Sequence, residues 1–176
     1  MKVLCVYPPF DPSYWGMEYS RHMVAKAGQL PPLGLLTVAA LLPREWEVRL
    51  CDMQVEPLRD ADLEWADVVF LSGMLIQREA LLGVARRARA VGTIVVCGGP
   101  YASALPDEVE PEVDCVVVGE AEELMAPLCA ALAAGRHALP RRLTAPRRPD
   151  VARSPLPRFD LLGSRRYHSM GVQWSR

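Results

Sequence analysis

The stretch that decides the fold is DVVFLSGMLIQREALLGVARRARAVGTIVVCGG, residues 67–99. It starts with an apolar run of strand length over 67–73, continues with a helical pattern over 77–92, and ends in a second apolar run over 93–99. Both runs are apolar at most positions, which is typical of strands that are covered on both faces. A strand, a helix and a second strand in this order predict a right-handed crossover between two parallel strands.

The same alternation extends in both directions from this unit. Further strand-length runs are KVLCVYP (2–8), WEVRLCD (46–52) and DCVVVGE (114–120), and further helical segments are LGLLTVAALLP (33–43) and EAEELMAPLCAALAAG (120–135). We therefore predict an α/β fold over residues 1–135, namely a doubly wound, flavodoxin-like (Rossmann-like) five-stranded parallel sheet with helices on both faces. Residues 136–176, here called the C-terminal segment, are predicted to be a Pro/Arg-rich linker and the start of a further domain.

Charge is unevenly distributed between these two parts. Residues 1–135 hold 10 Lys and Arg against 19 Asp and Glu, whereas the C-terminal segment holds 10 Arg against 2 Asp. The C-terminal segment also has five prolines, no lysine and no regular interleaving of aromatic residues. It therefore differs from basic segments that bind nucleic acid, and we expect no nucleic-acid partner. We expect it to lie on the acidic body of this chain or on a further domain.

Cellular location and redox state follow from simple patterns. No stretch reaches the roughly 18 uninterrupted apolar residues of a membrane span, and the N-terminus leads directly into a strand. We therefore expect no membrane span and a cytoplasmic location. The five cysteines are far apart and form no CxxC pair, so we expect buried thiols in a reducing compartment, without disulfides or a metal site.

Small and polar residues gather at the predicted carboxyl ends of the strands, where ligands bind in sheets of this kind. The candidates at these ends are Asp52, Met53, Ser72, Gly73, Met74, Leu75, Ile76, Gln77, Gly98, Gly99, Pro100, Tyr101, Gly119 and Glu120. A lone Gly-Gly is usually an ordinary turn. Three small-residue strand ends in one sheet instead predict a bulky ligand that passes close to the main chain, because glycine permits that approach.

The common nucleotide sites of such folds are not matched by this sequence. A dinucleotide site needs GxGxxG after the first strand, where this chain has YPPFDPSY, and no GxxxxGK of a P-loop occurs. A receiver domain needs an acidic pair after the first strand and a lysine near the last one. Here Asp11 stands alone, and lysine occurs only at positions 2 and 26.

What remains resembles a cobalamin-binding domain. Such domains share this fold and carry DxHxxG after the first strand, SxL after the third and GG after the fourth. This chain has Ser72-Gly73-Met74 and Gly98-Gly99 at the last two places. The resemblance implies that the corrin ring lies across the strand ends and that the nucleotide tail of the cofactor enters a slot beside the glycines. On this basis, leucine at either glycine should abolish cobalamin binding in a folded domain.

The axial histidine of that family is not matched. His22 is the only histidine near the first strand, and Ser20 and Ala25 stand where the motif has Asp and Gly. We therefore expect no protein ligand to cobalt. Met74, Leu75 and Ile76 would form an apolar wall beneath the metal or, alternatively, the buried first turn of a helix. Gln77 and Tyr101 are candidate donors to corrin amides or to the nucleotide tail or, alternatively, surface residues, and Glu120 is also explained by a helix start.

The pattern without DxHxxG resembles the N-terminal domain of cobalamin-dependent radical SAM enzymes, in the branch that includes hopanoid lipid methylases. The resemblance covers nearly the whole chain and is most specific over residues 52–79. Its last part, LPRFDLLGSRRYHSMGVQWSR, is similar to the approach to the cysteine motif of the radical SAM domain. The resemblance implies a further domain with S-adenosylmethionine and a [4Fe-4S] cluster, and methyl transfer from cobalamin to an unactivated carbon.

Three alternatives to this methyltransferase function stay open. These are a stand-alone cobalamin carrier or sensor, a flavodoxin-like module for another nucleotide, and a radical SAM cyclase. The substrate and the oligomeric state are not indicated by the sequence, because substrate contacts in this family lie mainly outside this domain.

Overall fold

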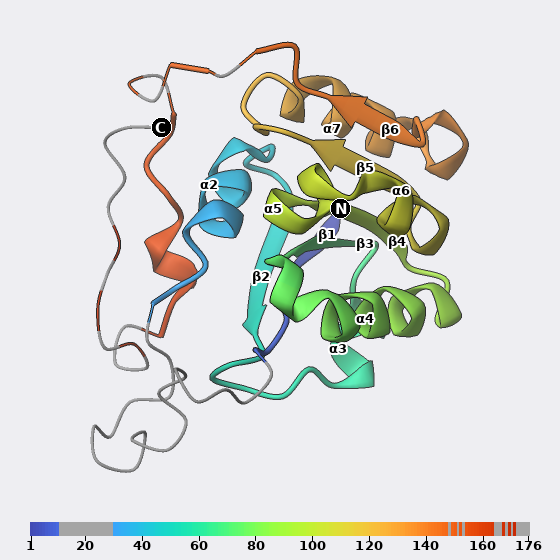
Figure 1. Ribbon diagram of the computed structural model, residues 1–176. Coiled ribbons are helices and arrows are strands. Elements are labelled where there is room, and N and C mark those ends of the chain that lie inside the picture. The colour runs from blue at the N-terminus through green and yellow to red at the C-terminus, as the bar shows by residue number, and fades with distance from the viewer. Residues whose placement is uncertain are drawn as a thin grey trace.

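The fold is a single parallel sheet with helices on both faces (Figure 1). The computed structural model describes residues 1–10, 30–147, 149–150, 152, 154–163, 167, 169 and 171, so that His22 lies outside the described residues. The strands are β1 (Lys2–Tyr7), β2 (Glu47–Asp52), β3 (Val68–Ser72), β4 (Ile94–Gly98), β5 (Cys115–Val118) and β6 (Arg142–Thr144). They pair in the order β2-β1-β3-β4-β5-β6, every pair parallel. The predicted doubly wound α/β fold is confirmed.

The described helices are α2 (Leu33–Leu41), α3 (Asp60–Trp65), α4 (Arg78–Ala90), α5 (Gly99–Ala104), α6 (Pro106–Val109) and α7 (Met125–Ala134). The three predicted helices are present as α2, α4 and α7, whereas α3, α5 and α6 have six residues or fewer and lack a long periodic pattern. α7 begins at Met125, so the suggestion that Glu120 begins a helix is wrong. Residues 119–124 form bends and turns before the helix instead.

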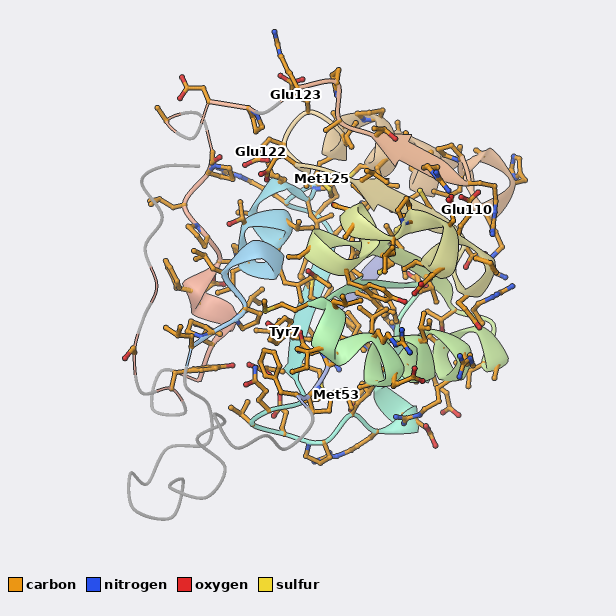
Figure 2. All side chains as sticks on the ribbon, viewed as in Figure 1. Tyr7, Met53, Glu110, Glu122, Glu123 and Met125 are labelled. Carbon is orange, nitrogen blue, oxygen red and sulfur yellow. The ribbon has the colours of Figure 1, made fainter. Side chains whose placement is uncertain are left out.

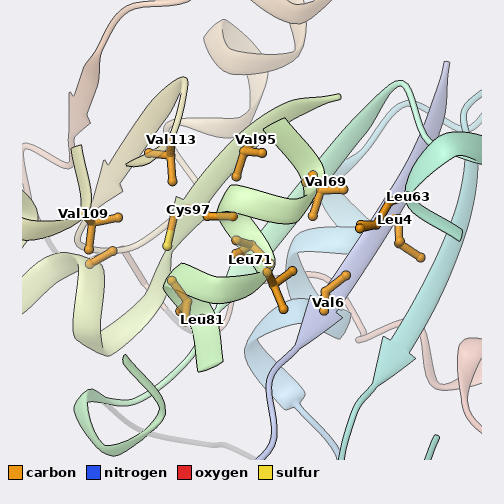
Figure 3. Packing of buried hydrophobic residues seen from close by; sticks show 14 of the residues in the cluster. Leu4, Val6, Leu63, Val69, Leu71, Leu81, Val95, Cys97, Val109 and Val113 are labelled. Atoms are coloured by element: carbon orange, nitrogen blue, oxygen red, sulfur yellow. The ribbon is translucent and has the colours of Figure 1, made fainter. Parts of the chain in front are cut away.

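Two hydrophobic layers result from the alternation of side chains along the strands. In β1, Leu4 and Val6 face the hydrophobic layer that is covered by α3, α4, α5 and α6. Figure 3 shows the packing of side chains in this layer. Val3 and Cys5 face the opposite layer, covered by α2 and α7. Because the central strands are buried on both faces, their sequences are apolar at nearly every position.

The sheet has six strands rather than the five that we expected. β6 is three residues long, and its burial pattern is exposed, half-buried, exposed. Among the described strands it is an edge strand that pairs only with β5, so it needs no apolar run and leaves no strand-like pattern in the sequence. Arg142 holds it against the body through ion pairs with Asp107, at 2.5 Å, and with Glu110.

The described part of the C-terminal segment lies on the acidic body, which is one of the two places that the charge pattern predicted. Arg136 pairs with Asp114 at 3.3 Å, and Arg147 pairs with Glu123 at 3.0 Å. Further along, the backbone N–H of Arg158 donates to the carbonyl of Leu36 in α2. The sequence of α2, LGLLTVAAL, has no charged residue, so both sides of this helix favour apolar cover. The sheet covers one side, and Leu161 packs on the same hydrophobic cluster.

Candidate ligand site at the carboxyl edge of the sheet

The predicted site residues meet at one edge of the sheet, because the carboxyl ends of parallel strands share an edge. Strand order reverses between β1 and β3, where the connections leave to opposite sides, and this is the place at which α/β sheets bind ligands. Asp52 and Met53 lie at the end of β2, and Gly119 and Glu120 follow β5. Residues 72–77 start at the last residue of β3, and residues 98–101 start at the last residue of β4. The fold therefore places the candidates along one edge of the sheet. Those after β3 lie beside the reversal point, whereas Gly119 and Glu120 lie two strands further along.

Met74, Leu75 and Ile76, here called the apolar patch, lie on the surface at this edge. Their exposed fractions are 50%, 50% and 54%. The alternative of a buried first helix turn is therefore wrong. A short 3-10 turn over Leu75–Gln77 precedes α4 and turns Gln77 inward while the three apolar side chains face solvent. An exposed run of three large apolar side chains beside a ligand edge is a typical contact surface.

Gln77 is buried and stabilises the apolar patch through a hydrogen bond to Met74. Its side chain is 1% exposed, its Oε1 accepts from the N–H of Met74 at 2.8 Å, and its Nε2 donates to the carbonyl of Pro8 at 2.5 Å. These two bonds join the connection after β3 to the end of β1 across the reversal point. The structure thus gives Gln77 an internal supporting role, and its role as a donor to a ligand stays a prediction.

Gly98 and Gly99 differ in backbone conformation and in the space available for a side chain. Gly99 has φ +86°, and a Cβ there would lie 2.2 Å from Oγ of Ser72. Gly98 has φ −138°, and a Cβ would lie 3.5 Å from Val117, which is an ordinary contact. Gly99 is therefore required by the fold itself, since any side chain would displace Ser72. Of these two glycines, Gly98 is therefore the one at which a larger side chain can test the predicted slot for the nucleotide tail without straining the backbone.

Gly119 is also constrained by its surroundings. Its φ is +85°, and a Cβ would lie 3.0 Å from the Cβ of Ala145, just beyond β6. Its N–H donates to Oγ of Ser103 in α5 at 2.9 Å. The C-terminal segment therefore closes over this strand end, which the sequence pattern did not indicate. Glu120 is partly buried in the following turn.

Tyr101 and Pro100 lie in the first turns of α5. Pro100 is exposed. Tyr101 is fully buried, its N–H donates to the carbonyl of Gly73, and its hydroxyl donates to Glu108 in α6 at 3.0 Å. Burial raises the pKa of Tyr101 to about 12, and the hydrogen bond to Glu108 adds to the shift. Its side chain therefore packs within the helical layer, and its predicted contact with a ligand stays a prediction.

Asp52 is the buried charged residue of the edge. It is 1% exposed; its Oδ1 accepts from the N–H of Gln54 at 2.9 Å, and its Oδ2 accepts from the hydroxyl of Tyr167 at 3.0 Å. Burial raises the pKa of Asp52 above its usual value, although both hydrogen bonds oppose the shift. Burial also raises the pKa of Tyr7, and the Asp52 carboxylate adds to the rise.

Tyr167 is the residue at this edge that sequence reasoning missed. It lies 115 positions from Asp52 and is 5% exposed. Together the two residues border a pocket of about 180 Å³, whose other lining residues are Leu50, Val55, Glu56, Leu161, Leu162 and Gly163. No local motif links a tyrosine in a Pro/Arg-rich stretch to a strand end, so only the three-dimensional path of the chain could reveal the pair.

Metal ligands are not gathered in the part of the chain that the structure describes. Within it, no group of three or more His, Cys, Asp or Glu side chains could hold a metal ion. Its one histidine, His137, follows α7 at the opposite edge, where the neighbouring Arg136 donates to the carbonyls of Gly92 and Thr93. None of the described helices is long and apolar enough to cross a membrane.

Comparison with known proteins gives a match to one protein family and matches to individual curated proteins. A family described as "B12 binding domain" matches residues 22–128. The chain is 41% identical, over its whole length, to "Uncharacterized methyltransferase sll1242" of Synechocystis sp. (strain ATCC 27184 / PCC 6803 / Kazusa). It is 35% identical, over 99% of its length, to "Hopanoid C-2 methylase" of Rhodopseudomonas palustris (strain TIE-1). No solved structure is a significant match.

A more distant match is "Bacteriochlorophyllide d C-12(1)-methyltransferase" of Chlorobaculum tepidum, 28% identical over 58% of this chain. The chain spans 33% of the length of each of the two relatives from Synechocystis and Rhodopseudomonas. All of these relatives are thus longer proteins, of which this chain corresponds to one part.

Proposed function

Because the chain belongs to the B12-binding domain family, we propose that its carboxyl edge holds cobalamin for a methyltransferase of the radical SAM class. In this proposal residues 1–135 form the cobalamin-binding domain, in the cytoplasm. The C-terminal segment leads to a further domain that holds S-adenosylmethionine and a [4Fe-4S] cluster. The names of the relatives support methyl transfer, and their greater length supports a further domain.

The observation that carries the proposal is the exposed apolar patch at the reversal point. A corrin ring is a wide, largely apolar disc with polar amides on its rim, so its face needs an apolar floor. Met74, Leu75 and Ile76 provide such a floor, each about half exposed. The connection after β4, which starts at Gly98 and Gly99, lies beside it, since β3 and β4 are neighbours in the sheet. The residues present therefore fit a bound corrin.

The chain's own residues act by binding and by excluding water. The apolar patch offers no nitrogen, oxygen or charged side chain to the metal, and the described histidine lies at the other edge. A thioether and two aliphatic side chains would keep water from the lower face of the ring. Bound cobalamin would supply a carrier for the methyl group. Its transfer to an unactivated carbon is a proposal for the whole protein and rests on the family resemblance.

The proposal is tested by binding of hydroxocobalamin to the purified chain. After gel filtration, cobalamin should elute with the protein, with its dimethylbenzimidazole displaced and without the spectrum of a histidine ligand. Equilibrium dialysis then compares Leu75→Gln with the control Leu156→Gln, whose side chain is 88% exposed on the C-terminal segment. Covering the exposed half of Leu75 is worth about 1 kcal/mol, or about fivefold in Kd.

Retention by the wild-type chain, with about fivefold weaker binding only in Leu75→Gln, supports the proposed site. No retention, or equal losses in Leu75→Gln and Leu156→Gln, contradicts a cobalamin site on the apolar patch. A new histidine band in the spectrum contradicts the absence of a protein ligand, and loss of that band in His22→Ala would assign it to His22.

A further inference from the structure

Tyr167 and Asp52 form a buried contact between the C-terminal segment and the ligand edge. The hydroxyl of Tyr167 donates to Oδ2 of Asp52 at 3.0 Å, and the two residues are 5% and 1% exposed. A buried carboxylate is costly unless it is hydrogen-bonded, so this donor is important for the end of β2. The contact is thus more than an incidental surface contact of a linker.

A short series of hydrogen bonds leads from this contact to the apolar patch. Next to Asp52, the N–H of Met53 donates to the carbonyl of Tyr7 at 2.9 Å, which joins the ends of β2 and β1; Figure 2 labels both residues. The adjacent Pro8 accepts from Nε2 of Gln77, whose Oε1 accepts from Met74. These hydrogen bonds therefore link the ends of β2, β1 and β3, one after the other.

The placement of buried polar side chains supports the importance of this series. The described residues contain three buried polar or charged side chains, Asp52, Gln77 and Thr93. Asp52 and Gln77 belong to the series, whereas Thr93 lies at the opposite edge and donates to the carbonyl of Leu63 at 3.0 Å. Buried polar groups that are fully hydrogen-bonded make local structure rigid, so the series holds the floor of the site in one arrangement.

We infer that Tyr167 is a positioning residue for the proposed cobalamin site, acting through Asp52 on the strand ends that carry the apolar patch. The inference rests on the proposed function for the identity of the ligand. With the C-terminal segment docked, the end of β2 is held against β1 and Gln77 holds Met74 in place. A site ordered before binding loses less freedom when the ligand arrives. By reciprocity, cobalamin should strengthen the docking of the segment.

The first test needs no ligand. Hydrogen exchange of the Met53 and Met74 amides is measured in the full chain and in Tyr167→Phe, which removes only the hydroxyl. The control is Thr93→Val, which removes a buried hydroxyl at the opposite edge. We expect both amides to exchange faster in Tyr167→Phe than in the wild type. In Thr93→Val we expect the exchange rates of these two amides, relative to the rest of the chain, to stay unchanged. Equal exchange in Tyr167→Phe and the wild type would overturn the inference, whether or not cobalamin binds.

The second test measures the Kd of hydroxocobalamin for the same variants and for Asp52→Ala. Loss of the Tyr167 hydroxyl should weaken binding by about three- to tenfold, which corresponds to the net contribution of one typical hydrogen bond. Because Tyr167 acts through Asp52, Tyr167→Phe should have no further effect in the Asp52→Ala background. Additive losses, or an equal loss in Thr93→Val, would overturn the inference. No binding by the wild type would instead contradict the proposed function, while the exchange result still decides the positioning role.

Discussion

Replacing Gly99 with alanine is expected to destabilise the chain through two separate effects. The backbone at Gly99 has φ +86°, a region that costs about 1–2 kcal/mol for a residue with a Cβ. The new Cβ would also lie 2.2 Å from Oγ of Ser72, so the serine must leave its rotamer, at about 0.5–1.5 kcal/mol. Together we expect the free energy of unfolding to fall by about 2–3 kcal/mol.

The assay is urea unfolding followed by circular dichroism, with Gly98→Ala as the matched control. Gly98 has φ −138°, and its Cβ would make an ordinary contact at 3.5 Å with Val117, so we expect a change within about 0.5 kcal/mol. Adding Ser72→Ala to Gly99→Ala removes the colliding oxygen and should recover the steric part, about 1 kcal/mol. If Gly99→Ala and Gly98→Ala are equally stable, the structural explanation of this glycine is refuted.

Two further predictions concern buried ionisable groups. Burial raises the pKa of Asp52, so the folded chain binds its proton at higher pH than the unfolded chain and Asp52 contributes more stability as the pH falls from neutral towards 4. Urea unfolding of Asp52→Asn should lack this increment relative to the wild type, and parallel pH profiles would contradict the explanation. All five cysteines are buried, and burial raises the pKa of Cys5 and Cys97 to about 12. A disulfide reagent at pH 8 should therefore react with the five thiols only after unfolding, and rapid reaction of the native chain would show that the core is open.

The sequence predicted the central part of the fold because the signals there are local. Strands buried on both faces are apolar at successive positions, and the connecting helices are long enough to show their own pattern. The position of the candidate site followed from the fold, since parallel strands place their carboxyl ends at one edge. β6 was not predicted because an exposed edge strand of three residues has neither an apolar run nor a long periodic pattern.

Individual site residues were harder to interpret from the sequence. Gln77 and Tyr101 were expected to face a ligand, yet the structure gives each of them internal hydrogen-bond partners. The apolar patch left two alternatives open, and only its exposure excluded a buried turn. A residue's type and position in the chain do not specify which way its side chain faces at a strand end, because that depends on neighbours from other strands.

The sequence by itself determined the α/β class, the parallel sheet and the edge at which a ligand would bind, because each depends on patterns within a few tens of residues. Only the tertiary structure decided that Gly99 makes room for Ser72, that Ala145 closes over Gly119, and that Tyr167 reaches Asp52. Asp52 and Tyr167 are 115 positions apart, and their meeting depends on how the C-terminal segment crosses the body. Contacts of this kind are products of packing between distant segments, which no local pattern encodes.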